Sequence, residues 1–145
     1  MVLELGAWGG EFEPDHSNEQ ESLAALRQGL KIGFRLIDTA EIYGLGLTEK
    51  IVGLAIKDYA RQEIILIDKV WRGNLSHDAL INSAQKSLEK LDTNYIDLYL
   101  IHSPNPDIPL SETIPAMEYL VDNKLVKHIG LSNVELGQVK EANKY

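Results

Sequence analysis

Short apolar runs alternate along the chain with longer segments in which apolar residues recur at helical spacing. This alternation is typical of βα units that build a parallel sheet. We therefore predict five such units in a single α/β domain that spans residues 1–145. The expected strands are 2–7, 34–38, 64–69, 95–101 and 127–131, and the expected helices are 18–32, 47–60, 77–91, 111–124 and 134–143.

In three of the expected strands, the alternate residues that share one face are apolar until the last one, which is polar. The second strand ends in this way at Asp38, the third at Lys69, and the fourth leads to His102. A barrel interior that is filled with aliphatic side chains and opens onto a polar mouth would produce this pattern. Arg35, Asp68 and Asp97 have the opposite parity, so we expect them to face the helices or their connecting turns and to be weaker candidates for catalysis.

Four polar residues of catalytic types lie at or just beyond the ends of successive expected strands: Asp38, Tyr43, Lys69 and His102. Because the carboxyl ends of parallel strands meet at one rim, we expect these side chains to converge. Each of them alone also has an ordinary structural interpretation, as a turn cap, a loop aromatic or a solvated strand end. An acid, a phenol, an amine and an imidazole at one rim have few structural reasons to gather, which favours a catalytic site.

These four groups suit the delivery of a proton to a carbonyl oxygen. A phenol gives up its proton sluggishly at neutral pH unless a neighbouring cation stabilises the phenolate, and we predict that Lys69 is this cation. Asp38 would pair with Lys69, and His102 would donate a hydrogen bond that orients the carbonyl group. None of the four can supply a hydride, so a reduction would require a nicotinamide cofactor.

The size and composition of the chain limit the alternatives. A complete eight-unit barrel typically needs roughly 250 residues, so 145 residues predict a partial (β/α)8 TIM-type barrel of about five parallel units, truncated at the carboxyl end. The net charge of −8 argues against nucleic acid or an anionic membrane as a partner. The sequence has no cysteine and shows neither a signal-peptide pattern nor a membrane-spanning run, so we expect a cytoplasmic location.

Several stretches resemble the aldo-keto reductase family. Residues 33–44 read GFRLIDTAEIYG and, with Glu49, Val52 and Gly53, look like the first signature of the family. Residues 125–133 read LVKHIGLSN and resemble its second signature. The family binds its cofactor on a β/α barrel, and the sequence agrees in that it lacks a G-x-G-x-x-G fingerprint after its first strand.

The resemblance implies a role for each matching residue. In the family an Asp, a Tyr, a Lys and a His in this order form the catalytic set, with the Tyr as general acid, and the matches are Asp38, Tyr43, Lys69 and His102. Ser132 and Asn133 match the residues that bind the nicotinamide carboxamide, and Trp8 and Trp71 are similar to tryptophans that wall the substrate pocket. From spacing alone, both tryptophans could equally be core aromatics. We expect no metal site, because the sequence offers neither cysteines nor an H-x-x-x-H helix pattern.

The resemblance implies an oxidoreductase that reduces an aldehyde or ketone by hydride transfer from NAD(P)H, with NADP(H) ahead of NAD(H). The alternative is a non-catalytic relative that serves as a partner-binding or regulatory module. With five of eight units, the last strand would present an unpaired edge and the inner face would be uncovered apolar surface. We therefore expect self-association or a complementary half-barrel chain, besides a small-molecule carbonyl substrate.

Overall fold

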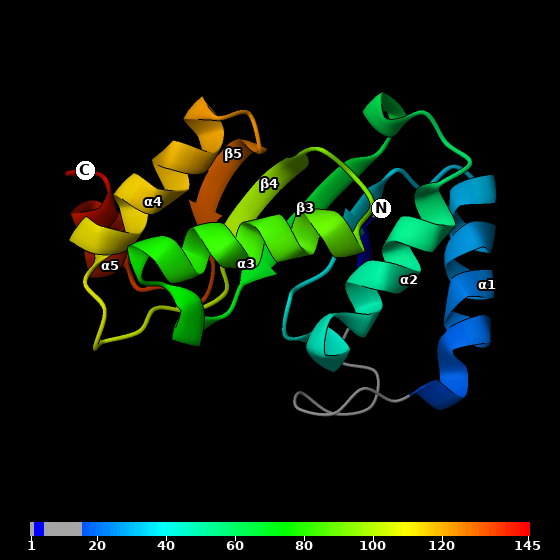
Figure 1. The fold of residues 1–145 in the computed structure, drawn as a ribbon, viewed down its shortest axis with the longest axis horizontal. Helices are drawn as coiled ribbons and strands as arrows, with labels where there is room; N and C mark the ends of the chain where they lie inside the picture. The colour runs from blue at the N-terminus through cyan, green and yellow to red at the C-terminus, as the bar shows by residue number, and fades with distance from the viewer. Residues whose placement is uncertain (1, 5–15) are drawn as a thin grey trace.

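Five parallel strands form one sheet in the order β1-β2-β3-β4-β5 (Figure 1). The computed structural model describes residues 2–4 and 16–145. The strands are β1 Val2–Glu4, β2 Leu36–Asp38, β3 Ile65–Val70, β4 Ile96–Ile101 and β5 Val126–Leu131. The helices are α1 Glu19–Lys31, α2 Leu47–Ile56, α3 His77–Lys90, α4 Leu110–Asp122 and α5 Leu136–Ala142, and the short 3₁₀ turns are η1 His16–Asn18, η2 Tyr43–Gly46, η3 Arg61–Glu63 and η4 Arg72–Asn74. The predicted sequence of five βα units is confirmed.

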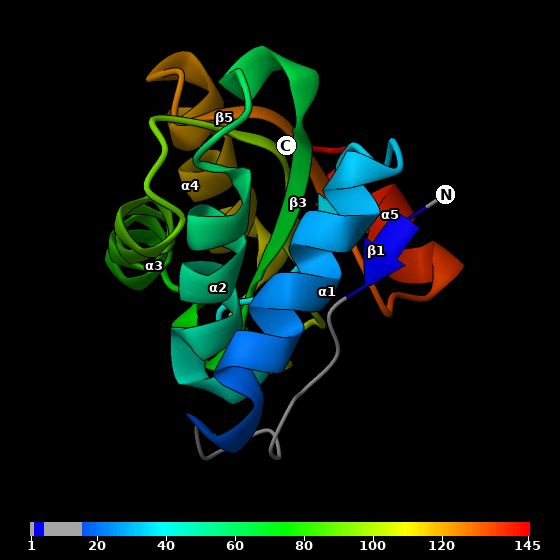
Figure 2. The same cartoon turned by 90° about the vertical axis from the view of Figure 1, so that its right-hand side faces the viewer.

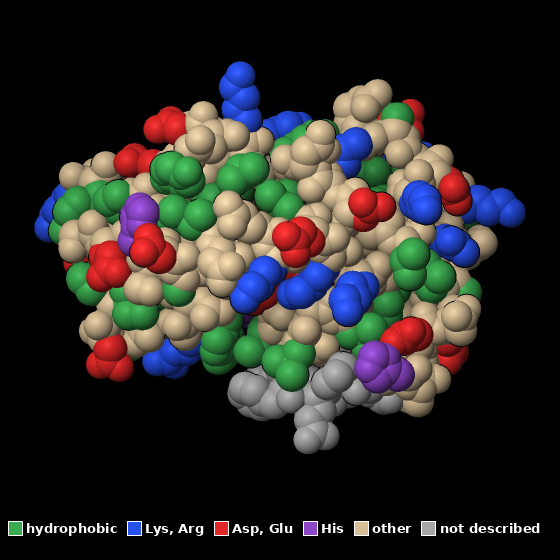
Figure 3. Space-filling view, viewed as in Figure 1, with side chains coloured by type: hydrophobic (Ala, Val, Ile, Leu, Met, Phe, Trp, Pro, Cys, Tyr) green, Lys and Arg blue, Asp and Glu red, His purple; other side chains and the backbone are tan. Residues whose placement is uncertain are grey.

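Helices α1 to α4 cover one face of the curved sheet (Figure 2). The strand residues that face them, among them Leu66, Tyr99 and Ile101, are completely buried. On the opposite face Ile65 is 47% exposed and Ile67 is only partly buried. The alternation predicted from the sequence is therefore confirmed, and the helix-covered face holds the main apolar core. Acidic and basic side chains are interspersed on the outer surface of these helices (Figure 3).

Strand β2 is shorter than the sequence pattern predicts, because the end of α1 uses the residues before it. Gly33 adopts a φ of 105°, a left-handed conformation that suits glycine, and its N–H donates to the Leu30 carbonyl at 3.1 Å. The Phe34 N–H donates to the Gly29 carbonyl at 3.1 Å, so it closes the helix and does not join the sheet. The ladder consequently begins at Leu36.

A cluster of charged side chains joins three strands at their amino ends, away from the predicted rim. Asp97 on β4 accepts hydrogen bonds from Arg61 Nη2 at 2.8 Å, from Lys127 Nζ at 2.7 Å and from the Leu66 N–H at 3.0 Å. Both cations also lie over the ring of Tyr95, at 3.9 Å for Arg61 and 4.2 Å for Lys127. One carboxylate thus ties β4 to β5 and to the segment that leads into β3, at the end of the sheet opposite the predicted catalytic residues.

Burial on its own raises the pKa of Asp97, but hydrogen bonds from Leu66, Lys127 and Arg61 outweigh this effect and hold the pKa below its ordinary value. A lowered pKa means that the carboxylate stabilises the fold above the ordinary value of about 4 and that this contribution is lost as the pH falls through the lowered value.

We predict that Asp97→Asn lowers the free energy of unfolding by about 1–3 kcal/mol at neutral pH, because it leaves two cations without their shared acceptor. The difference should shrink as the pH falls below about 4. Denaturant unfolding across this pH range measures both effects. Asp58→Asn, at an exposed position, is the matched control. A loss that is equal at every pH would contradict the assignment.

Candidate active site

Backbone hydrogen bonds continue the sheet beyond the strand ends and set the spacing of the predicted rim residues. They are Thr39 N–H to Ile67 O at 2.9 Å, Glu41 N–H to Lys69 O at 3.1 Å, His102 N–H to Val70 O at 3.0 Å and Ser132 N–H to Ile101 O at 2.9 Å. Each connects the loop that follows one strand to the next or previous strand. The carboxyl ends of β2 to β5 therefore lie along one edge, as the parallel arrangement predicts.

Lys69, at the carboxyl end of β3, pairs with Asp38 at the end of β2. The Lys69 ammonium donates to Asp38 Oδ1 and also to the Thr39 carbonyl at 3.2 Å. Lys69 is buried, with 6% of its surface exposed. A charge so far removed from water needs a partner of opposite sign and hydrogen-bond acceptors, and these two groups provide both. The structure brings together the pair that the sequence suggested.

Tyr43 begins a left-handed turn directly after β2 and its loop. The next three residues all have positive φ, at 54° for Gly44, 49° for Leu45 and 92° for Gly46. Glycine adopts this conformation readily, whereas Leu45 is an uncommon case. The turn places the Tyr43 ring so that its centroid is 5.3 Å from Lys69 Nζ. The phenol and the amine therefore share one site, although 26 positions separate them in the sequence, from 43 to 69.

His102 follows β4 and lies between two aromatic rings. Its imidazole contacts Tyr43 edge-on, with centroids 5.6 Å apart and an interplanar angle of 85°. It contacts Trp71 in the same manner at 5.9 Å and 85°. The acid, phenol, amine and imidazole predicted from the sequence are thus neighbours, with Trp71 beside them. Trp8, the other predicted pocket residue, lies outside the described residues.

The two predicted cofactor residues follow β5 and bind to the loop that carries His102. Asn133 has a φ of 54°, a left-handed conformation that asparagine tolerates better than most residues. Its Nδ2 donates to the His102 carbonyl at 2.7 Å and to Ser132 Oγ at 3.2 Å. This connection between a predicted catalytic residue and a predicted cofactor residue was not foreseen from the sequence.

Glu41 is a part of the site that the sequence analysis missed. Its Oε1 accepts hydrogen bonds from the Trp71 N–H and from Asn74 Nδ2, the latter at 3.1 Å. It thereby joins the loop after β2 to the loop after β3 and fixes the start of the segment that carries Trp71. The available sequence signal was weak: Glu41 is the one acidic residue between Asp38 and Tyr43.

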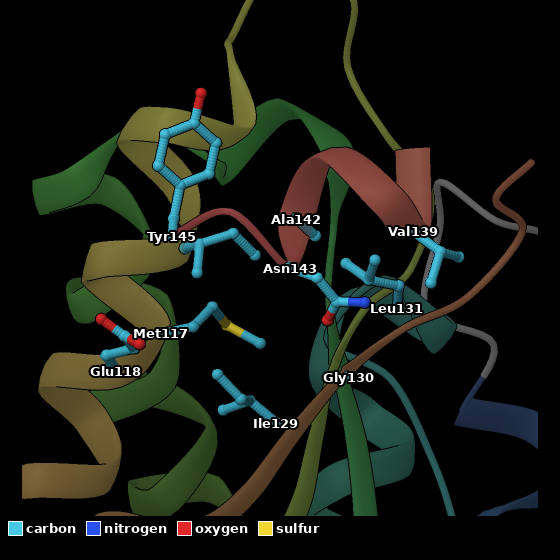
Figure 4. Close-up of a pocket in the computed structure, with 10 residues that line it drawn as sticks. Met117, Glu118, Ile129, Gly130, Leu131, Val139, Ala142, Asn143 and Tyr145 are labelled. Carbon is cyan, nitrogen blue, oxygen red and sulfur yellow. The ribbon is translucent and has the colours of Figure 1, made fainter. Parts of the chain in front are cut away.

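Among the hollows near the carboxyl-terminal part of the chain, two differ in their relation to the site. One, of about 620 Å³, opens between the loops after β4 and β5 and has Ser103 and Asn133 among its lining residues, so it adjoins the site. The other, of about 330 Å³, lies between α4, β5 and α5 (Figure 4). Its walls include Met117, Ile129 and Leu131, and none of the predicted site residues lines it.

Across the described residues, no group of three or more His, Cys, Asp or Glu side chains is arranged to hold a metal ion. In the same part of the chain, no helix combines the length and the apolar character needed to cross a membrane. The cytoplasmic location stays a prediction.

The model of the Aldo/keto reductase family matches residues 2–145, and the chain belongs to this family. Aldo-keto reductase YhdN of Bacillus subtilis is 38% identical over 141 residues, which cover 91% of this chain and 41% of that relative. Methylglyoxal reductase YeaE of Escherichia coli is 38% identical over 127 residues, which cover 88% of this chain and 44% of that relative. The chain therefore spans less than half the length of these curated relatives.

Solved structures agree with this assignment. The thermostable aldo-keto reductase Tm1743, crystallised with the inhibitor epalrestat, superposes with a TM-score of 0.94 at 43% identity, over 99% of this chain and 53% of that one. An aldo/keto reductase from Klebsiella pneumoniae in complex with NADP and acetate gives a TM-score of 0.85 at 36% identity, over 97% of this chain and 48% of that one. The predicted fold class, a partial TIM-type barrel of about five parallel βα units, is confirmed.

We predict that Glu41→Ala loosens the segment that begins at Trp71. Hydrogen bonds to charged groups contribute about 1.5–3 kcal/mol, so the Trp71 amide should exchange with solvent about tenfold to hundredfold faster, at 1.4 kcal/mol per factor of ten. Residue-resolved hydrogen exchange measures this rate. Glu89→Ala, at an exposed position of α3, is the control and should leave the rate unchanged. Equal protection of Trp71 in Glu41→Ala and in the unaltered chain would contradict the role of Glu41.

Proposed function

We propose that the chain reduces an aldehyde or ketone by NADP(H)-dependent hydride transfer, with Tyr43 as the general acid. The observation that carries this proposal is the grouping of Asp38, Lys69, Tyr43 and His102 at one edge of the sheet. Membership of the aldo-keto reductase family supports it. So does the name of the E. coli relative, methylglyoxal reductase, which points to a small carbonyl substrate.

In the proposed reaction, Tyr43 transfers its phenolic proton to the carbonyl oxygen as the carbon is reduced, which yields an alcohol. The ammonium of Lys69, 5.3 Å from the ring centroid, stabilises the phenolate that remains. Asp38 holds the ammonium in place. His102, edge-on to the same ring, donates a hydrogen bond to the carbonyl oxygen and orients it toward Tyr43. The bound cofactor would supply the hydride.

Ser132 and Asn133 would hold the nicotinamide carboxamide. An amide and a hydroxyl match the donors and acceptors of a carboxamide, and within the described residues no group donates to the amide oxygen of Asn133. Asn133 uses its amide nitrogen to bind the His102 carbonyl, so the carboxamide would lie next to the residue that orients the substrate. The Klebsiella relative, whose structures contain NADP and NADPH, supports NADP(H) as the cofactor. Trp71, beside His102, would form part of the substrate pocket.

We further propose that residues 1–145 form one incomplete barrel domain whose inner face is covered by a second copy or by a complementary half-barrel chain. Among the described strands, β1 and β5 each pair on one side only. On the inner face Ile65 is 47% exposed, and Ile67, Leu98 and Leu100 are only partly buried. An open strand edge beside exposed apolar side chains favours association.

We predict that Tyr43→Phe lowers the turnover of methylglyoxal about 10²- to 10⁴-fold, the range typical of a lost general acid, while NADPH still binds. NADPH fluorescence titration and absorbance-monitored turnover measure the two properties separately. Tyr119→Phe, which alters an exposed phenol on α4, is the matched control. Unchanged turnover in Tyr43→Phe would refute the proton-donor role. If the unaltered chain shows no saturable NADPH binding, the non-catalytic module is favoured.

We predict that the chain sediments as an assembly of more than one copy and that Leu98→Lys shifts it toward the monomer, because a charge on the inner face opposes burial. Analytical ultracentrifugation with and without NADPH measures the mass. Gln85→Lys, at an exposed position of α3, is the control for the added charge. A monomeric unaltered chain in both conditions would contradict self-association and leave the complementary half-barrel as the proposed partner.

A further inference from the structure

A second cluster of polar side chains lies behind the site, between the sheet and its covering helices. Asp68 on β3 and Tyr99 on β4 are direct neighbours across the parallel ladder. Glu49 from α2 and Ser87 from α3 complete the cluster, and all four residues are 0% exposed. Gly53, one turn after Glu49, permits this close packing, since a Cβ there would lie 2.8 Å from a carbonyl oxygen at the end of α3.

The hydrogen bonds of this cluster are incomplete. Within the described residues, no group has the geometry of a hydrogen bond to either oxygen of Asp68, to Glu49 Oε1, to Ser87 Oγ or to the Tyr99 hydroxyl. The Ser87 hydroxyl nevertheless lies close enough to Asp68, Glu49 and Tyr99 to lower the pKa of each. Glu49 Oε2 accepts from Lys90 Nζ at 2.7 Å. Within the described residues, Lys90 pairs with Glu49, whereas no cation pairs with Asp68. An ionised carboxylate without a partner is strongly disfavoured at such a site, so one of the two groups should be neutral.

The surrounding charges indicate which group is neutral. Burial is the main cause that raises the pKa of Asp68 well above its ordinary value, and the charges of Glu49 and Glu41 add to it, which outweighs the opposite effect of the Lys69 N–H and the Ser87 hydroxyl. Burial also raises the pKa of Glu49, but there the ammonium of Lys90 acts in the opposite direction. The pKa of Tyr99 is raised well above its ordinary value by burial and by Asp68, so its hydroxyl stays neutral.

We propose that Asp68 keeps its proton at neutral pH, so that Asp68 and Glu49 together carry a single negative charge, which Lys90 balances. As a neutral acid, Asp68 adds no second charge near the carboxylate of Glu49, which pairs with Lys90. The pair is thus a buried acid and carboxylate of the kind that cannot both ionise.

The pair is placed to position the proposed proton donor. Glu49 lies in the first turn of α2, directly after the turn that carries Tyr43. The Lys90 side chain crosses that turn closely, since a Cβ at Gly46 would clash with Lys90 Nζ. A second charge on Asp68 would repel Glu49 and loosen the start of α2. Asp68 is therefore a positioning residue, and this step alone rests on the proposed function of Tyr43.

The effect of pH on stability follows from the sign of the shift. A carboxyl group whose folded-state pKa is raised loses its proton first in the unfolded chain, so stability falls as the pH rises from about 4, the ordinary value, to the raised value. Asp68→Asn replaces a neutral acid with a neutral group of similar shape. The variant should melt several degrees higher than the unaltered chain at alkaline pH, and the difference should vanish near pH 4. Asp58→Asn, which is exposed, should show no such trend.

A second measurement does not depend on any variant. The infrared spectrum of the unaltered chain, made with ¹³C-aspartate, should show an isotope-shifted carbonyl band of a protonated carboxylic acid at neutral pH. The positioning step has its own readout, the amide chemical shift of Leu45 in the turn after Tyr43. That shift should follow the loss of the band as the pH rises and should not do so in Asp68→Asn.

The absence of the isotope-shifted band at neutral pH would show that Asp68 has lost its proton and would overturn the proposal, whether or not the chain is a reductase. A difference in melting temperature between the unaltered chain and Asp68→Asn that stays constant as the pH changes would also overturn it. A band that titrates while the Leu45 shift stays constant would overturn only the positioning role. Loss of carbonyl turnover bears on Tyr43 and leaves these three readouts untouched.

Discussion

Hydrogen bonds between parallel strands continue past the ends of β2, β3 and β4, and they set the distances among side chains that are far apart in the sequence. The bond from His102 N–H to Val70 O places the imidazole beside β3, next to the strand position that carries Lys69. The bond from Glu41 N–H to Lys69 O fixes the loop that leads to Tyr43. Because the register of a parallel sheet allows little adjustment, it brings the four candidate groups together at one edge of the sheet.

At both ends of the sheet, a buried or partly buried carboxylate pairs with a cation from a neighbouring segment. Asp97 at the amino ends and Asp38 at the carboxyl ends each accept hydrogen bonds from cations on a neighbouring strand or turn. These pairs let the fold bury charge without a large penalty, and they join strands that only backbone bonds would otherwise connect. Asp68 is an exception, since within the described residues no cation pairs with it. Asp68 directly precedes Lys69 on β3 but faces the core. Its protonation should therefore affect the stability of the fold, as does that of Asp97.

The inner face of the sheet connects the site to the question of assembly. The same alternation that directs Lys69 and Asp38 to the rim also directs Ile65, Leu98 and Leu100 to the face that the helices do not cover. A complete barrel would bury this face with its remaining strands. The site and the open surface therefore belong to one side of the sheet, and whatever covers that surface also determines how dry the site becomes.

The sequence by itself determined the number and order of the βα units, the direction that each strand side chain faces and the residue types gathered at the rim. These features depend on local periodicity, which is written in consecutive residues. Only the tertiary structure decided the contacts that join separate segments, among them the bond from Asn133 to the His102 carbonyl, the bridge that Glu41 forms and, within the described residues, the lack of a cation partner for Asp68. Such contacts depend on the register between strands and on how closely α2 approaches α3. Neither quantity produces a repeating pattern of residues in the sequence, so neither could be predicted from it.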